Sequence, residues 1–302
     1  MLTREQQELI DEELGYIENI PTLPDIAFRI NELVNDPDTS MRQLESVIEM
    51  DPMLSSAVLK VVNSSFYGMA REISSLRLAL VILGIREIKN LVLSLTVFQS
   101  FKDFHLTHSF DYKQFWLHSA VTGQIAKSLA KKLYLKFEGA EFVGGLIHDI
   151  GKIVMLEYDT ETYSALLDGE GEPSHPLWTR EEDHYGFHHG QVGGWLAGLW
   201  RLPRRLVAAV LYHIEPDKSP HYQQLVGIVS LANALAHRLE HHSDIDDYVE
   251  IIPEHPATDV LMNHTSGLET IDWEQFSREL QSDLERAWEF VRLSQQSLWQ
   301  TA

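Results

Sequence analysis

The sequence predicts an all-α protein, and three observations support this fold class. Apolar residues recur at spacings of three and four along most of the chain, helix-capping residues precede many of these stretches, and the alternation typical of strands is almost absent. The chain has 302 residues, of which 44% are apolar. It is therefore long enough for a sizeable core within one large or two closely associated domains.

The N-terminal part predicts a series of short, packed helices. The first covers about residues 24–35 and ends at an Asn-Asp-Pro sequence. The second begins after Ser40, because Gln43 three residues later permits a capping box. The third begins after Asp51, a natural N-cap that is followed by Pro52 in the first helical position.

Residues 75–101 contain two helical patterns separated by Gly84, an arrangement that superficially resembles a DNA-reading helix-turn-helix. The second helix offers only Arg86 and Lys89 to phosphates, and it is apolar on nearly all sides through Leu91, Val92, Leu93, Leu95, Val97 and Phe98. The net charge of −21 also repels nucleic acid. We therefore expect a buried helix and no nucleic-acid partner.

The pattern along the chain suggests three parts. Residues 1–110 form an N-terminal helical subdomain, and residues 111–242 form a second subdomain with the candidate metal-binding residues. Residues 243–302 form an acidic helical appendage. Helices are expected from residue 112, before residue 148 and in three segments between 189 and 240, whereas residues 159–183 predict a surface excursion. The last helix should pack on the body or on another chain through Trp273, Phe276, Leu280, Leu284 and Trp288.

The N-terminus lacks a basic region followed by an apolar core, and no apolar run reaches the roughly 18 residues of a membrane span. We therefore expect a cytoplasmic protein without a membrane partner. The chain has no Cys but 15 His, which excludes disulfides, thiolate metal sites and a Cys nucleophile. Any metal must be held by His, carboxylate or amide oxygen.

His118 faces the core of its predicted helix, and the adjacent pair His148 and Asp149 ends the next apolar helix. Consecutive helical side chains diverge by about 100°, so this pair converges on one ion only where the helix opens, and Gly151 supplies such an opening. Imidazole and carboxylate suit Fe, Mn, Zn, Ni or Co. The alternative for His118 is a structural core histidine satisfied by a neighbouring group.

The sequence HDIGK at 148–152, preceded by a core-facing His on a helical chain, resembles the HD phosphohydrolase superfamily. The stretches IPTLPDIAFRINELVNDP, MDPMLSSAVLKVVNSSFYG and LRLALVILGIREIKNLVLS resemble the N-terminal half of the HDOD (HD-related output domain) family, and GFHHGQVGGWLAGLWRLPRRLVAAVLYH resembles its later half. Together these stretches extend over roughly residues 16–240.

The resemblance implies an HD-domain-like helical bundle with an N-terminal helical subdomain. It implies one divalent transition metal, Fe, Mn, Ni or Zn, with partial support for a second, and the matching ligand positions are His118, His148, Asp149, His189, His213 and Asn233. Lys152 matches the phosphate-facing Lys of the relatives. Two positions depart from the HD pattern, because Ile214 replaces a His and Asn233 replaces the terminal Asp, and no Gly-Tyr-Pro motif is present.

Alternatives remain for several of these residues. His189 and His213 could be structural or solvent-facing histidines, and Lys152 could be a solvated Lys at a helix end. We expect four other histidines to lie at the surface, namely His184, His188, His241 and His242.

Two functions follow from the resemblance. The first is a bacterial signal-transduction module that retains an incomplete HD metal pocket and binds a signalling partner or a small phosphorylated ligand. The second is a metal-dependent phosphohydrolase in which Asp149 is ligand and proton acceptor while Lys152 neutralises charge on the phosphate. Asn233, which carries no negative charge, favours the first function.

Overall fold

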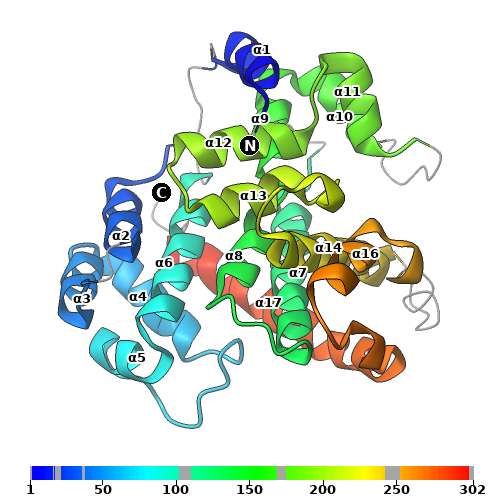
Figure 1. Cartoon of the computed structure of the whole chain (residues 1–302). Coiled ribbons are helices and arrows are strands. Elements are labelled where there is room, and N and C mark those ends of the chain that lie inside the picture. Colours follow the sequence, from blue (N-terminus) through cyan, green and yellow to red (C-terminus); the bar gives the residue numbers. More distant parts are fainter. Residues whose placement is uncertain are drawn as a thin grey trace.

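The computed structural model of the chain describes residues 2–15, 17, 22–35, 38–101, 110–168, 175–241 and 252–298. All regular structure in these residues is helical, which confirms the predicted all-α fold (Figure 1). Helices α2 to α6, within residues 25–100, gather on one side of the molecule, and helices α7 to α14, within residues 112–241, form the other side. None of the helices in the described residues combines the length and the apolar character that a bilayer crossing requires.

Six helices form the N-terminal part of the described chain, namely α1 (Arg4–Leu14), α2 (Asp25–Asn35), α3 (Met41–Glu49), α4 (Pro52–Val62), α5 (Leu76–Leu83) and α6 (Ile85–Ser100). The three whose starts were predicted, α2, α3 and α4, begin as expected, whereas α1 was not predicted. Ser40 and Gln43 form the expected capping box at α3. The Asp51 carboxylate accepts the backbone N–H groups of Met53 and Leu54 at α4.

Helix α6 is buried along most of its length and packs against α2, α4, α5 and α8. Its six apolar residues from Leu91 to Phe98 that were predicted to be buried are all buried. A helix enclosed in this way has no face to offer to a DNA groove, so the buried-helix interpretation is confirmed.

The second half of the chain contains α7 (Tyr112–Lys132), α8 (Ala140–Ile147), α9 (Ile150–Tyr158), α10 (Thr160–Asp168), α11 (Leu177–Tyr185), α12 (His189–Leu199), α13 (Arg204–Tyr212), the 3₁₀ turn η1 (Pro216–Lys218) and α14 (Gln223–His241). Helix α7 packs on α8 and α14. The approach of α7 to α8 depends on glycines, because a Cβ on Gly145 would lie 2.5 Å from the Gly123 Cα. This contact brings α7, which carries His118, against the helix that His148 directly follows.

The expectation of a surface excursion over residues 159–183 is wrong for most of that segment. Its described residues form α10 and most of α11, and Tyr163 and Glu181 on these helices are completely buried. The segment is polar because most of its side chains face outward. The few inward positions decide how it packs, and local composition does not reveal them.

The C-terminal part contains α16 (Pro256–His264), the 3₁₀ turn η2 (Leu268–Thr270) and α17 (Trp273–Leu298). Helix α17 packs across α4 and α7, and Figure 1 shows it lying behind the central helices. Phe276 and Phe290 are buried, whereas Trp288 is 39% exposed. The side chains of Leu280 and Leu284 lie outside the described residues. The boundaries near 110 and 242 adjoin segments that also lie outside them, so the three-part division stays a prediction.

Candidate metal centre

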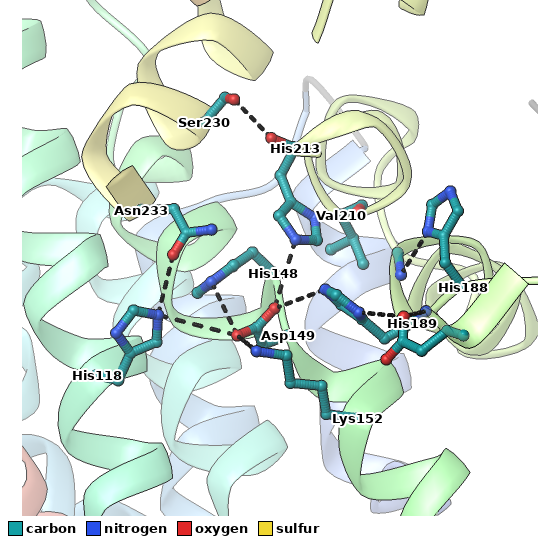
Figure 2. Close-up of polar contacts among 12 residues, drawn as sticks. His118, His148, Asp149, Lys152, His188, His189, Val210, His213, Ser230 and Asn233 are labelled. Atoms are coloured by element: carbon teal, nitrogen blue, oxygen red, sulfur yellow. Dashed lines mark hydrogen bonds and ion pairs between the residues drawn. The ribbon is translucent and has the colours of Figure 1, made fainter. Parts of the chain in front are cut away.

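The candidate site lies where two helices, α7 and α14, meet the ends of four others, α8, α9, α12 and α13 (Figure 2). His118 comes from the middle of α7, and Asn233 comes from α14. His189 is the first residue of α12, and His213 directly follows α13. The chain thus contributes donors from positions far apart in sequence to one buried point.

The dyad His148 and Asp149 lies at a break between two helices. Helix α8 ends at Ile147 and α9 begins at Ile150, and Asp149 has φ −98° and ψ 7° between them. This break allows the two adjacent side chains to converge, since His148 Nε2 lies 3.3 Å from Asp149 Oδ2.

The sequence argument assigned this opening to Gly151, but Gly151 is already inside α9. The role of Gly151 is a different one. A Cβ at this position would lie 1.9 Å from the His189 carbonyl oxygen, so the missing side chain lets α12 approach the dyad.

Asp149 is the centre of the cluster, and its two oxygens face different histidines. Oδ1 lies 3.3 Å from His189 Nε2 and 3.4 Å from His213 Nε2. Oδ2 lies 3.3 Å from His148 Nε2 and 3.8 Å from His118 Nε2. Two half-sites therefore share Asp149. Half-site A consists of His118, His148 and Asp149, and half-site B consists of Asp149, His189 and His213, with the donor atoms of each within 4.8 Å of one another.

Hydrogen bonds on the far side of three imidazoles orient them toward Asp149. His148 Nδ1 lies 2.7 Å from the Gly145 carbonyl oxygen, and His213 Nδ1 lies 2.7 Å from that of Val210. His189 Nδ1 lies 2.7 Å from a carboxylate oxygen of Glu181. Because each of these acceptors requires an N–H on Nδ1, Nε2 is the nitrogen of each ring that can bind a metal at the centre of the cluster.

Three of the inward-facing atoms fit a cation. His148 Nε2, His213 Nε2 and Asp149 Oδ1 are buried and have no hydrogen-bond partner among the described residues. A buried polar atom without a partner costs about 1–3 kcal/mol. A divalent metal in half-site B would satisfy His213 Nε2 and Asp149 Oδ1, and one in half-site A would satisfy His148 Nε2, so the residues present fit such an ion.

The charges around the cluster also favour a cation. Burial alone would raise the pKa of Asp149, but His148 and Lys152 hold it well below its ordinary value. Burial would lower the pKa of His189, yet Glu181 and Asp149 outweigh it and raise this pKa to about 9. The environment of His189 Nε2 thus stabilises positive charge, which a metal ion can supply in place of the proton.

His118 and Lys152 complete the cluster on the side of Oδ2. Lys152 Nζ forms a 3.0 Å ion pair with Asp149 Oδ2. His118 Nε2 lies 3.0 Å from Asn233 Oδ1, in a hydrogen bond that the imidazole N–H donates to the amide oxygen. His118 thus differs from the other three imidazoles, because its Nε2 already has a partner.

Comparison with known proteins identifies the family. A sequence profile described as HDOD domain matches residues 20–216. The chain belongs to the HDOD family. The match includes the histidines of both half-sites and Lys152, whereas Asn233 lies beyond its end.

This HDOD chain is similar to a protein of known sequence and to several solved structures. An uncharacterized protein from Treponema pallidum (strain Nichols) is 29% identical over 225 residues, which are 72% of this chain and 42% of that protein. The chain thus spans less than half the length of this relative. Among solved structures, an HDOD domain protein of unknown function from Geobacter sulfurreducens superposes with a TM-score of 0.77 at 23% identity, covering 97% of this chain and 98% of that one.

A second solved structure, a candidate phosphohydrolase from Shewanella amazonensis SB2B, has a TM-score of 0.72 at 21% identity and covers 93% of this HDOD chain and 97% of its own. At these identities the structural likeness establishes the fold alone.

The HDOD site contains residues that the sequence argument missed. Glu181 binds His189, and the His237 ring packs against the His118 ring in a tilted arrangement with centroids 4.4 Å apart. His237 lies one helical turn after Asn233 on α14, a spacing that could have indicated it. Burial lowers the pKa of His237 well below its ordinary value. Glu181 carried no comparable signal, because it lies in an acidic segment.

The expectation that His188 lies at the surface is wrong. His188 is 2% exposed and is the N-cap of α12, where its Nδ1 accepts the backbone N–H of Gly190 at 3.1 Å. Burial lowers its pKa to about 2, so the ring stays neutral and keeps accepting this bond. His184 is exposed as expected. His242 and the side chain of His241 lie outside the described residues.

Proposed function

We propose that this protein is a signal-transduction module of the HDOD family that holds a divalent transition metal in its buried HD pocket. In this proposal the metal-loaded protein binds a signalling partner or a small phosphorylated ligand through the groove between its helical halves. The observation that carries the proposal is the convergence of four buried histidines on Asp149 in two half-sites, where His148 Nε2, His213 Nε2 and Asp149 Oδ1 have no hydrogen-bond partner among the described residues.

The residues that would hold the metal are His148 and His118 on one side of Asp149, and His189 and His213 on the other. A metal bound there would supply Lewis acidity and would lower the pKa of a bound water. Asp149 supplies the negative charge between the half-sites, and Lys152 keeps Asp149 ionised while adding a positive charge that suits a phosphate group.

Three features favour a regulatory module over a working hydrolase. Asn233 offers an amide oxygen beside His118 but no negative charge, and Ile214 offers no donor atom at the position after His213. The third feature is burial, because His148, Asp149 and His213 are at most 2% exposed. A phosphoester needs access to the metal to react, whereas a metal that organises a regulatory surface does not.

The second candidate function is a metal-dependent phosphohydrolase, and the position of Lys152 favours it. Its ammonium group lies 3.0 Å from Asp149 Oδ2, where it could neutralise charge on a phosphoryl oxygen. In that reaction Asp149 would also be placed to take a proton from the attacking water.

Metal analysis tests the first proposal. Protein purified without added metal should contain a divalent transition metal, and His148→Ala should lose it while far-UV circular dichroism keeps the helical signal. His184→Ala is the matched control, because His184 is exposed and belongs to neither half-site, and it should keep the metal. A wild-type chain that neither retains nor binds Mn, Fe, Ni or Zn would refute the proposal.

Hydrolysis assays separate the two functions. The regulatory proposal predicts no turnover of a generic phosphoester when Mn, Fe or Ni is supplied. Turnover that disappears in Asp149→Ala would instead establish the hydrolase.

The proposed module acts in the cytoplasm and binds no nucleic acid. Its net charge of −21 supports the second statement, because it repels the phosphates of nucleic acid.

A further inference from the structure

Glu181 on α11 is a completely buried carboxylate, and its hydrogen bonds connect it to half-site B. Its Oε2 accepts two bonds from His189, at 2.7 Å from Nδ1 and at 2.9 Å from the backbone N–H. Its Oε1 accepts the hydroxyl of Tyr163, which is itself completely buried on α10. One carboxylate thus receives three hydrogen bonds.

The burial of such a carboxylate is energetically unfavourable. Desolvating a carboxylate costs several kcal/mol unless charged or hydrogen-bonding partners compensate for the loss of water. Among the described residues, the hydrogen-bonding groups around Glu181 are those of His189 and Tyr163. The compensation is therefore concentrated on one imidazole of the candidate centre.

The bond to Nδ1 determines what His189 presents to Asp149. A carboxylate at Nδ1 keeps the proton on that nitrogen, fixes the plane of the ring and makes the opposite nitrogen more basic. His189 Nε2 lies 3.3 Å from Asp149 Oδ1, on the inner side of half-site B. His148 and His213 are oriented by backbone carbonyls, which are neutral, so His189 receives the strongest electrostatic support of the three.

We propose that Glu181 is a positioning residue for metal binding at half-site B, acting through His189, with Tyr163 holding Glu181 in place. This inference rests on the proposed metal centre and goes beyond it, because it ties the affinity of the pocket to helices α10 and α11. Half-site A gains nothing directly from Glu181, since His118 and His148 have other partners.

The test is a double-substitution cycle on the full-length protein, with the metal-free chain titrated with Zn²⁺ in competition with a chromophoric chelator. Glu181→Gln keeps the size of the side chain and removes its charge, and it should weaken Zn²⁺ binding about 10- to 100-fold, the usual effect of losing such a partner. Glu182→Gln is the matched control on the same helix and should change the affinity less than about 2-fold.

The second half of the cycle separates positioning from a purely structural role. In His189→Ala protein the ring through which Glu181 acts is gone, so adding Glu181→Gln should change the remaining Zn²⁺ affinity less than about 2-fold. An equal loss in both backgrounds would mean that Glu181 supports the fold alone. Proton NMR of the Zn²⁺-loaded protein adds an independent readout, because the proton on His189 Nδ1 should show the strong downfield shift of a hydrogen bond to a carboxylate in wild type and lose that shift in Glu181→Gln.

Tyr163→Phe covers the case in which Glu181→Gln does not fold. It removes one hydroxyl and leaves Glu181 in place, and it should weaken Zn²⁺ binding about 2- to 10-fold, less than Glu181→Gln. Unchanged Zn²⁺ affinity in folded Glu181→Gln, or in Tyr163→Phe if only that variant folds, overturns the inference while the metal centre stands. A wild-type chain that binds no Zn²⁺ overturns the inference together with the proposed function.

Discussion

Gly151 of α9 lies against the backbone of His189 in α12, so closely that a Cβ on Gly151 would lie 1.9 Å from the His189 carbonyl oxygen. This contact joins the helix that follows the His148 and Asp149 dyad to the helix that begins with His189. The missing side chain therefore sets the distance across half-site B.

Gly151→Ala should separate these two helices. Overpacking of a tight core contact usually costs about 1–3 kcal/mol, and a backbone carbonyl cannot move aside as a flexible side chain can. We expect the free energy of unfolding in urea to fall by at least this amount and Zn²⁺ binding to weaken. The control is Gly198→Ala on α12, where a Cβ meets nothing within 4 Å, and it should leave stability unchanged or raise it by about 0.5–1 kcal/mol. Native-like stability and Zn²⁺ affinity in Gly151→Ala would contradict the role of this contact.

Features that depend on neighbouring residues in the sequence were predictable. The capping box at Ser40, the cap at Asp51 and the apolar faces of α6 are local, and each has the predicted structure. The same reasoning required a helix break at the dyad but assigned this break to Gly151. The sequence does not show that Gly151 instead lies against the backbone of another helix.

Features that depend on tertiary burial were not predictable. Glu181 looks like one more acid in a polar segment, and it becomes a partner of His189 only when α11 folds over the start of α12. His188 looks like a surface residue for the same reason, although it caps that helix from a buried position. Local composition reports average exposure, whereas these two roles depend on single inward positions.

Asn233→Asp should strengthen metal binding at half-site A. Asn233 Oδ1 lies 3.0 Å from His118 Nε2, so a carboxylate here would add a negative charge directly beside that half-site. Because site charge tunes cation affinity, we expect a gain of about 10-fold for Zn²⁺ or Mn²⁺. The same competition titration measures it, and Asn263→Asp on α16 provides a control for the change in net charge. Equal affinity in wild type and Asn233→Asp would show that Asn233 does not face the metal.

The free energy of unfolding of the protein should decrease in acid because His255 becomes protonated. This residue caps α16 by accepting the Ala257 backbone N–H on Nδ1, and burial lowers its pKa from 6.5 to about 4. Above pH 6.5 the ring is neutral in both the folded and the unfolded chain. Between pH 6.5 and 4 the unfolded chain binds the proton more readily, so stability decreases as the pH falls.

His255→Asn isolates this contribution. Asn is a favoured N-cap and does not titrate, so the helix start is preserved while the proton linkage disappears. The difference in unfolding free energy between wild type and variant should move by about 2–3 kcal/mol in favour of the variant from pH 7 to pH 4. Urea denaturation at several pH values measures this difference. Parallel stability profiles for the two proteins would mean that His255 is protonated as easily in the folded chain as in the unfolded one.

Phe290 of α17 should be among the most important residues for the stability of the whole chain. Its ring is completely buried, with centroid distances of 5.3 Å to Phe66 and 5.1 Å to Phe142. Phe66 follows α4 in the N-terminal part and Phe142 belongs to α8, so one side chain packs against both sides of the molecule. Removing it leaves a cavity between them that neither ring can fill without backbone movement.

Phe290→Ala should therefore lower the free energy of unfolding by about 3–5 kcal/mol. Trp288→Ala, two residues earlier and 39% exposed, removes a larger ring and should cost less because that ring is only partly buried. Both values come from urea denaturation followed by circular dichroism. If α17 were an independent appendage, Phe290→Ala would melt this helix alone and leave the main transition at its wild-type midpoint. A single transition shifted to lower urea shows instead that the C-terminal helix is part of the cooperative core.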